Sequence, residues 1–256
     1  MSALLTDKVA IVTGSGGGLG AAIAHAFAAE GARVVVSDIN SGAAAETAAG
    51  IDGAVAIPAD VTSEDQVQAL IDRTVAELGG LHVMVANAGV GIPRPLLETS
   101  LADWRRTTSV NLDGVFLSIR YSAPAIIATG GGAIITLSSI TSVAGTPLMA
   151  SYAAAKAAVR NLTQTAAIEL RPFGVRVNAL LPGFVDTTLV TNQITNFETM
   201  LGLDSGQFDQ LIAQKQGRYG TPEEVAAAAV FFASDQSAWC TGSGLVIDGG
   251  YTSSLL

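Results

Sequence analysis

The sequence predicts an α/β fold, a doubly wound parallel sheet of about seven strands with helices on both faces. Two observations predict it. Segments with apolar residues at helical spacing separate the strand candidates, as in the stripe Val67, Leu70, Ile71, Val75 and Leu78. The strand candidates are mostly solid apolar runs, as expected for parallel strands that are covered on both faces. They span residues 9–12, 34–36, 54–57, 83–86, 133–137, 175–181 and 245–247.

Helix starts agree with this alternation. Ser63 with Gln66, and Thr221 with Glu224, are spaced as capping boxes, and Pro222 stands at a first helical position. Each such helix would return the chain to the same edge of a parallel sheet. A ligand crevice is then expected at the carboxyl ends of the strands.

Composition favours one large domain over residues 1–256. Hydrophobic residues make up 49% of the chain and charged residues 14%, which suffices for a deep core, and no linker-like stretch divides the sequence. Residues 184–216 differ, because they mix Thr, Asn, Gln and Gly with apolar residues and show no clear period. We expect this segment to be a mobile, substrate-binding lid over the crevice.

The charge and the cysteine content limit the kinds of partner that we expect. The net charge is −9 and the 13 Lys and Arg residues are scattered, so the basic stripe that nucleic-acid binding needs is absent. Residues 1–8 lack the pattern of a secretory signal, and glycines and prolines interrupt the uncharged tract between Arg120 and Lys156, so we expect no membrane partner. The single Cys240 cannot form an internal disulfide, which fits a cytoplasmic location, and no ligand cluster predicts a metal.

A glycine-rich turn, Gly14-Ser15-Gly16-Gly17-Gly18-Leu19-Gly20, follows the first predicted strand and precedes a helix. Glycines there permit positive φ and let the backbone approach a pyrophosphate at the helix N-terminus. Alone, the cluster is also consistent with a flexible turn. Asp38, which ends the next strand about 20 residues further on, is placed to accept hydrogen bonds from a ribose. Together they predict a Rossmann-type dinucleotide site.

The same residues predict NAD rather than NADP. The Asp38 carboxylate would oppose the 2′-phosphate of NADP, and neither Ile39 nor Ser15 supplies a basic side chain to bind that phosphate.

A second constellation is formed by Ser139, Tyr152 and Lys156. Tyr152 and Lys156 are four residues apart, so a helix presents them on one face. A free tyrosine has a pKa of about 10, and an adjacent ammonium group favours the phenolate, so we predict that Lys156 activates Tyr152. The alternative is a core tyrosine beside a surface lysine. Lys156, however, lies at the end of a long uncharged tract, where a charge needs a buried partner or a function.

These motifs resemble those of the short-chain dehydrogenase/reductase family over essentially the whole chain. The matching residues are Thr13-Gly14-x-x-x-Gly18-x-Gly20, Asp60-Val61, Asn87-Ala88-Gly89, Asn111, Ser139, Tyr152-x-x-x-Lys156, and Pro182-Gly183 with Thr187.

The resemblance implies a role for each catalytic residue. Tyr152 would be the general acid-base, Lys156 would hold the ribose and lower the pKa of Tyr152, and Ser139, rather than Ser138, would orient the substrate oxygen. Asn111 would support a water chain that relays the proton from Lys156 to solvent. The implied cofactor contacts are Gly14, Gly17, Leu19, Asp38, Asp60, Val61, Asn87, Tyr152, Lys156, Val185 and Thr187.

Two positions depart from the family pattern. Ala86 replaces an asparagine, and His82 stands where relatives often carry an aspartate. Both positions are thought to brace a strand, so we expect His82 to be a structural or surface histidine rather than a pH switch.

The predicted function is hydride transfer between NAD and a secondary alcohol or its ketone. Apolar residues near the motifs favour an apolar or alicyclic substrate; they are Val90, Val143, Leu148, Met149, Phe184 and Leu189. One alternative is a 3-oxoacyl thioester reductase using NADPH, which disagrees with Asp38. Another is a non-catalytic nucleotide sensor or scaffold, which would not need all four catalytic-type residues. The resemblance also implies a homo-oligomer, with a tetramer favoured and residues 254–256 in an interface.

Overall fold

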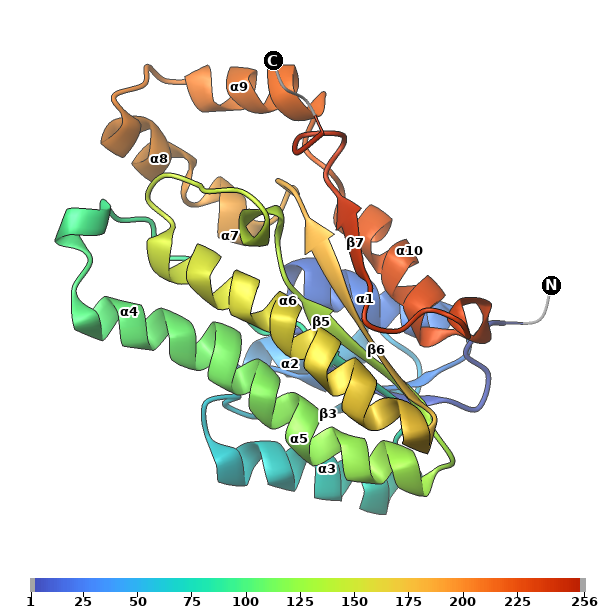
Figure 1. Ribbon diagram of the computed structural model, residues 1–256. Helices are drawn as coiled ribbons and strands as arrows, with labels where there is room; N and C mark the ends of the chain where they lie inside the picture. The colour runs from blue at the N-terminus through green and yellow to red at the C-terminus, as the bar shows by residue number, and fades with distance from the viewer. Residues whose placement is uncertain (1–2, 254–256) are drawn as a thin grey trace.

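The computed structural model describes residues 3–253. A seven-stranded parallel sheet, in the order β3-β2-β1-β4-β5-β6-β7, forms its centre (Figure 1). Its strands are β1 (Val9–Thr13), β2 (Arg33–Ser37), β3 (Val55–Ala56), β4 (Val83–Ala86), β5 (Gly132–Leu137), β6 (Val175–Pro182) and β7 (Gly244–Ile247). The predicted fold class and all the predicted strands are confirmed.

Helices cover both faces of the sheet (Figure 1). One face carries α1 (Gly18–Ala29), α2 (Ser41–Ala49) and α10 (Pro222–Ala233), and the other carries α3 (Glu64–Leu78), α5 (Gly114–Ala128) and α6 (Ala150–Leu170). A shorter helix, α4 (Leu101–Thr108), packs against α6.

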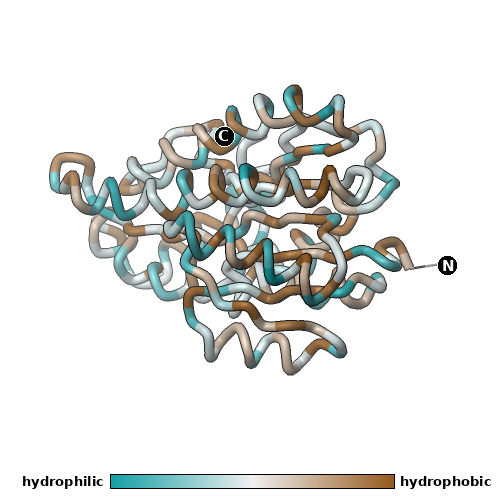
Figure 2. Tube along the Cα trace, turned by 90° about the horizontal axis from the view of Figure 1, so that it is seen from below, coloured by the Kyte–Doolittle hydropathy of each residue, from teal (hydrophilic) through white to brown (hydrophobic). Residues whose placement is uncertain are grey.

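Successive side chains of a strand enter different cores, which explains why the predicted strands are solidly apolar. In β1, Ala10 and Val12 pack with α1 and α10, whereas Val9 and Ile11 pack with α3 and α5. The hydrophobic segments accordingly concentrate in the interior of the chain trace (Figure 2).

The order of the strands reverses between β1 and β4. From β1 the chain winds outward to β2 and β3, and from β4 it winds the opposite way to β7. A crevice at the carboxyl ends of the strands is expected at such a reversal. The glycine turn after β1 lies at this point.

The two predicted capping boxes differ. At α10 the box is complete, because Thr221 Oγ1 accepts from the Glu224 amide at 3.4 Å and Glu224 Oε2 accepts from the Thr221 amide at 2.8 Å. At α3 only half of it forms. Ser63 caps the helix, but Gln66 Oε1 accepts from the Asp60 amide at 2.9 Å, because Gln66 turns toward the loop that follows β3.

Residues 184–216, which show no clear period in the sequence, contain three short helices. They are α7 (Thr188–Thr191), α8 (Ile194–Leu201) and α9 (Gln207–Gln216). The rings of Phe197 and Phe208 stack at 5.2 Å and form a small core with Ile212. The Glu198 carboxylate accepts from the Gly206 amide at 2.7 Å and so joins α8 to the start of α9.

His82 is a structural histidine, as predicted. Its Nδ1 accepts a hydrogen bond from the Val9 amide at 3.0 Å and so joins the starts of β1 and β4. Burial lowers the pKa of His82, with smaller contributions from Lys8 and Arg33, and this favours the neutral form that can accept that bond.

In residues 3–253, no helix is both long enough and apolar enough to cross a membrane. The predicted interface residues 254–256 lie outside the described residues.

Candidate active site

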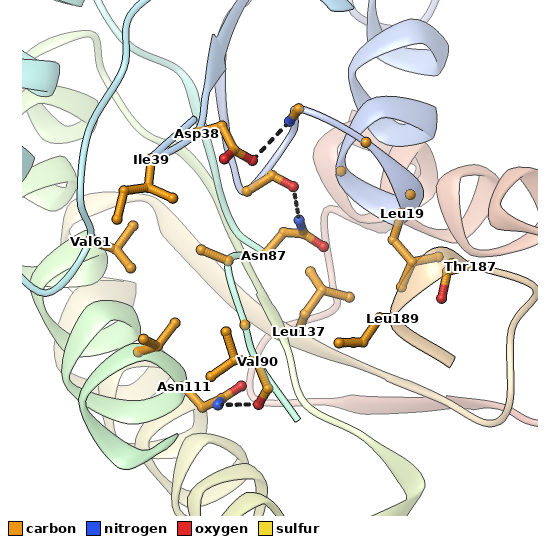
Figure 3. A pocket seen from close by; sticks show the side chains of 18 of the residues that line it. Leu19, Asp38, Ile39, Val61, Asn87, Val90, Asn111, Leu137, Thr187 and Leu189 are labelled. Carbon is orange, nitrogen blue, oxygen red and sulfur yellow. Dashed lines mark hydrogen bonds between the residues drawn. The ribbon is translucent and has the colours of Figure 1, made fainter. Parts of the chain in front are cut away.

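One cleft of about 770 Å³ lies at the carboxyl ends of the central strands (Figure 3). It brings together residues that the sequence spreads over most of the chain. Every predicted catalytic or cofactor residue lines it, namely Gly14, Gly17, Leu19, Asp38, Asp60, Val61, Asn87, Asn111, Ser139, Tyr152, Lys156, Val185 and Thr187. The structure gives their arrangement, and their roles stay predictions.

Further lining residues were not predicted. Most are neighbours of the motif residues, so their place in the chain could have indicated them, but no pattern singled out Arg106. They include Gly16, Ala59, Ala88, Gly89, Arg106, Val110, Thr188 and Val190.

The glycine turn between β1 and α1 is compact. Gly14 has φ +61°, and a Cβ added there would lie 2.7 Å from the Cα atom of Ala88. Asn87 fixes the turn from β4, because its Nδ2 donates to the carbonyls of Thr13 and Gly14 at 2.8 and 2.9 Å. A Cβ added at Gly17 would meet nothing within 4 Å, so this position is open toward the cleft. The turn therefore leaves backbone groups accessible to a ligand.

Asp38 follows β2 and faces the glycine turn (Figure 3). Its Oδ2 accepts from the Gly16 amide at 3.0 Å and its Oδ1 accepts from the Asn40 amide at 2.9 Å. Each carboxylate oxygen can accept a second hydrogen bond, so Asp38 retains acceptor capacity toward the cleft. Ile39 beside it is 73% exposed.

The interpretation of Ser15 as a position for phosphate recognition is wrong. Ser15 is fully buried, and its hydroxyl donates to the Val12 carbonyl at 2.6 Å and accepts from the Ser37 amide at 3.0 Å. It joins β1 to β2 and does not face the cleft. The open position in the turn is Gly17.

Lys156 is 3% exposed on α6, and its Nζ donates to the Leu137 carbonyl at 2.6 Å. Burial lowers its pKa to about 8. The Nζ atom lies 5.4 Å from the centroid of the Tyr152 ring, so the two side chains are neighbours, as their spacing predicts. The alternative of a surface lysine is excluded.

The effect of Lys156 on the pKa of Tyr152 stays a prediction. Burial raises the pKa of Tyr152, and a hydrogen bond with Ser139 offsets only part of that increase. Ser138, the competing serine, donates to the Lys156 carbonyl at 2.8 Å and has a structural role.

Asn111 lies in a π-helical turn, Ser109–Asp113, between α4 and α5. Its Nδ2 donates to the carbonyls of Val90 and Thr107 at 2.7 and 2.9 Å, which fixes the side chain (Figure 3). Its Oδ1 is buried and has no partner within residues 3–253. A Cβ added at Gly89 would lie 2.8 Å from this Oδ1 and 3.5 Å from Lys156 Nζ. An unpaired acceptor is thus placed close to the buried ammonium group.

A second pocket of about 100 Å³ adjoins Ser139 and Tyr152. Of the apolar residues expected to surround the substrate, Met149, Phe184 and Leu189 line this pocket, and Val90 lines the larger cleft. Two others line neither cavity. Val143 is 44% exposed, and Leu148 packs against the core of α8 and α9.

Comparison with known proteins gives concordant matches. Residues 14–252 match a family model described as enoyl-(acyl carrier protein) reductase. Cis-4-hydroxycyclohexanecarboxylate dehydrogenase of Sinomonas cyclohexanicum is 41% identical, over 98% of this chain and 99% of that protein. Cyclohexanol dehydrogenase of Acinetobacter sp. (strain SE19) is 38% identical, over 99% and 98%. The crystal structure of a short-chain type dehydrogenase/reductase from Mycobacterium marinum superposes with a TM-score of 0.88 at 36% identity, covering 97% of this chain and 96% of that one.

Proposed function

The chain belongs to the short-chain dehydrogenase/reductase family and is an oxidoreductase, and on that premise we propose that it interconverts alicyclic secondary alcohols and their ketones with NAD as cofactor. One observation carries the proposal. Ser139 and Tyr152 line both the cleft that holds the predicted dinucleotide residues and the smaller, largely apolar pocket. The names of two similar proteins, which act on cyclohexane alcohols, support the same substrate class.

The residues of the cleft fit a nicotinamide dinucleotide. The backbone of the glycine turn would hold the pyrophosphate at the N-terminus of α1, and Asp38 would accept hydrogen bonds from the adenosine ribose. When bound, the cofactor accepts or supplies the hydride. The unpaired Asn111 Oδ1 and the buried Lys156 Nζ supply polar groups at the other end of the cleft.

The choice of NAD rests on the neighbourhood of Asp38. Its carboxylate keeps acceptor capacity for ribose hydroxyl groups, whereas a 2′-phosphate would add negative charge beside it. The neighbouring positions that are open to the cleft, Gly17 and Ile39, carry no positive charge. NADP would therefore meet both a repulsion and a missing partner.

Tyr152 is the proposed general acid-base. The Ser139 hydroxyl lines the same two cavities and would orient the substrate oxygen beside the phenol. Since burial raises the pKa of Tyr152, the phenol is held ready to donate its proton in ketone reduction. In alcohol oxidation Tyr152 must first lose that proton, so a path to solvent is needed.

Lys156 and Asn111 form the proposed start of that path. Lys156 uses one donor on Leu137 and has two more, so it can bind a ribose hydroxyl and pass a proton. The unpaired Oδ1 of Asn111 beside it is an acceptor for a water molecule. Together they would relay protons between Tyr152 and solvent.

We further propose that residues 184–216 act as a lid and that the whole chain works as one domain. Leu189 and Val190 of α7 line both cavities, and the Glu198 bond would let α8 and α9 move as one unit.

We propose that the protein forms a homotetramer through an apolar surface near the edge of the sheet. Leu245 and Val246 of the edge strand β7 are partly exposed, and Trp239 is 99% exposed. Large exposed apolar side chains of this kind are typical of subunit interfaces.

The experiment is a panel of secondary alcohols, cyclohexanols and linear alkanols included, monitored by the absorbance of NADH. Formation of NADH with the cyclohexanols at higher kcat/KM than with linear alkanols would support the proposal. Turnover of a 3-oxoacyl thioester with NADPH, and none of the cyclohexanols, would contradict it.

A further inference from the structure

The pocket beside Ser139 and Tyr152 contains no charged side chain among its described lining residues. They are Gly91, Pro93, Ser139, Ile140, Thr141, Thr146, Met149, Tyr152, Gly183, Phe184, Leu189, Val190, Gln193 and Phe197. Apolar atoms make most of this wall, and the polar groups are hydroxyls and one carboxamide. A ring that enters here meets hydrogen-bonding groups but no ion.

The nearby arginines place no positive charge in the wall of the pocket. Arg94 lies in the same loop as Pro93, but its Nε pairs with Asp103 at 3.4 Å and it lines neither cavity. Arg106 lines the larger cleft and not the pocket. A substrate carboxylate in the pocket would therefore lose water without gaining a cation, which is strongly unfavourable.

Two lining side chains offer a donor to an uncharged group. The Thr141 hydroxyl is buried and has no partner within residues 3–253, and Gln193 supplies a carboxamide. Gln193, the residue before α8, is half-buried, and its Oε1 accepts from Asn196 Nδ2 at 2.9 Å. That bond orients the carboxamide, and no group of residues 3–253 accepts a hydrogen bond from its Nε2. Since Gln193 lines the pocket, its unpaired N–H groups are donors available at the pocket wall.

We propose that the substrate is an uncharged alicyclic alcohol or ketone with a second oxygen on its ring, and that Gln193 determines this specificity by donating to that oxygen. The inference deepens the proposed function and rests on it. A hydroxyl, carbonyl, ester or carboxamide substituent satisfies Gln193 Nε2, whereas a carboxylate brings an uncompensated charge into the pocket.

A matched pair of ketones tests the proposal. 4-Oxocyclohexanecarboxamide and 4-oxocyclohexanecarboxylate have nearly the same shape, differ in charge at neutral pH, and have no cis and trans isomers. Reduction of each is followed by loss of NADH. Binding of each is measured by calorimetry in the presence of NAD, which has no hydride to transfer to a ketone. We expect kcat/KM and affinity to favour the carboxamide by about 10²-fold. Equal or better use of the carboxylate would overturn the proposal.

Variants assign the effect to Gln193. Gln193→Arg places a cation in the pocket and should raise kcat/KM for the carboxylate by about 10-fold or more, which narrows or inverts the ratio. Gln210→Arg, the same change at an exposed position of α9 outside both cavities, should keep the ratio of the parent protein. The same gain in Gln210→Arg as in Gln193→Arg would contradict the assignment.

The two proposals fail in different ways. If the alcohols of the panel and both ketones are not turned over, the proposed function fails, and calorimetry still decides the present inference. Tighter binding of the carboxamide would then support an uncharged ligand, and equal binding would overturn it.

Discussion

The side-chain carboxamide of Gln216 exchanges two hydrogen bonds with the backbone of Phe184. Its Oε1 accepts from the Phe184 amide at 2.9 Å and its Nε2 donates to the Phe184 carbonyl at 2.6 Å. Gln216 ends α9, and Phe184 lines the small pocket directly after the Pro182-Gly183 end of β6. One buried side chain thus joins the last residue of the proposed lid to its first residue, which lines the proposed substrate pocket.

Replacing Gln216 by Leu should raise KM for a cyclohexanol by about 10-fold with a smaller effect on kcat. The change leaves the amide of Phe184 without a partner, whereas its carbonyl keeps the hydrogen bond from the Gly220 amide at 3.0 Å. An unsatisfied buried group costs about 1–3 kcal/mol. Steady-state kinetics and thermal unfolding measure both effects. Gln210→Leu, at an exposed position of the same helix, is the control and should match the parent. A parent-like KM in Gln216→Leu would show that Phe184 does not depend on this contact.

Tyr152→Phe tests the assignment of the acid-base. The change removes the phenol and keeps the ring, so kcat should fall by about 10² or more while NADH still binds. Initial-rate assays measure kcat, and a titration followed by NADH fluorescence measures the affinity for NADH. Tyr121→Phe, which loses a hydrogen bond to Glu64 and lines neither cavity, should retain parent turnover. Parent-like turnover in Tyr152→Phe would exclude the mechanism.

The buried ammonium group of Lys156 should lower the stability of the folded protein, although the proposed reaction needs it. Burial lowers its pKa from 10.5 to about 8, while the unfolded chain keeps a pKa of about 10.4. Between these two values the unfolded state binds more protons, so the free energy of unfolding should rise with pH from about 8 to about 10.4. Below that window the folded state carries the full cost of the buried ammonium group.

Lys156→Met removes this titration. Without cofactor the variant should be more stable than the parent at about pH 7 and should lose the rise above about pH 8, while turnover and NADH affinity both fall. Urea unfolding at several pH values measures the first effect, and kinetics with calorimetry the second. Lys215→Met, on α9, is the control. An unchanged NADH affinity would contradict the proposal that Lys156 binds the ribose of the cofactor.

Amide hydrogen exchange tests the lid. If α7, α8 and α9 close over the cleft, exchange in residues 184–216 should slow when NADH and a substrate analogue bind together, and more than with NADH alone. Exchange in β1 and β4, which are buried within the sheet, serves as the reference. Equal rates in all states would indicate a fixed wall instead.

The strands and the position of the cleft could be predicted from the sequence. Solid apolar runs predicted every strand of the sheet because burial on both faces leaves a strong local pattern. The motif residues fall in one cleft because strand ends of a doubly wound sheet meet there. Local spacing did not indicate where Ser15 and Gln66 point, since each side chain bonds to a separate strand or loop.

Long-range packing accounts for the remaining differences. The short helices α8 and α9 depend on aromatic contacts with residues as distant as Tyr219 and Tyr251, so no period within residues 184–216 indicated them. The raised pKa of Tyr152 likewise follows from burial by the whole fold, which the spacing of Tyr152 and Lys156 cannot show.

The preference for NAD over NADP is tested most directly by measuring kcat/KM with each cofactor on the same alcohol. The contacts of Asp38 predict that NAD is preferred by about 10²-fold or more. Exchange of Asp38 for Ala together with Ile39 for Arg removes the anion and adds a guanidinium group, so the preference should shrink or invert. Ile39→Arg alone, with the carboxylate kept, is the control and should invert the preference less. Equal use of NADP and NAD by the parent protein would contradict the role of Asp38 and favour an NADPH-dependent reductase instead.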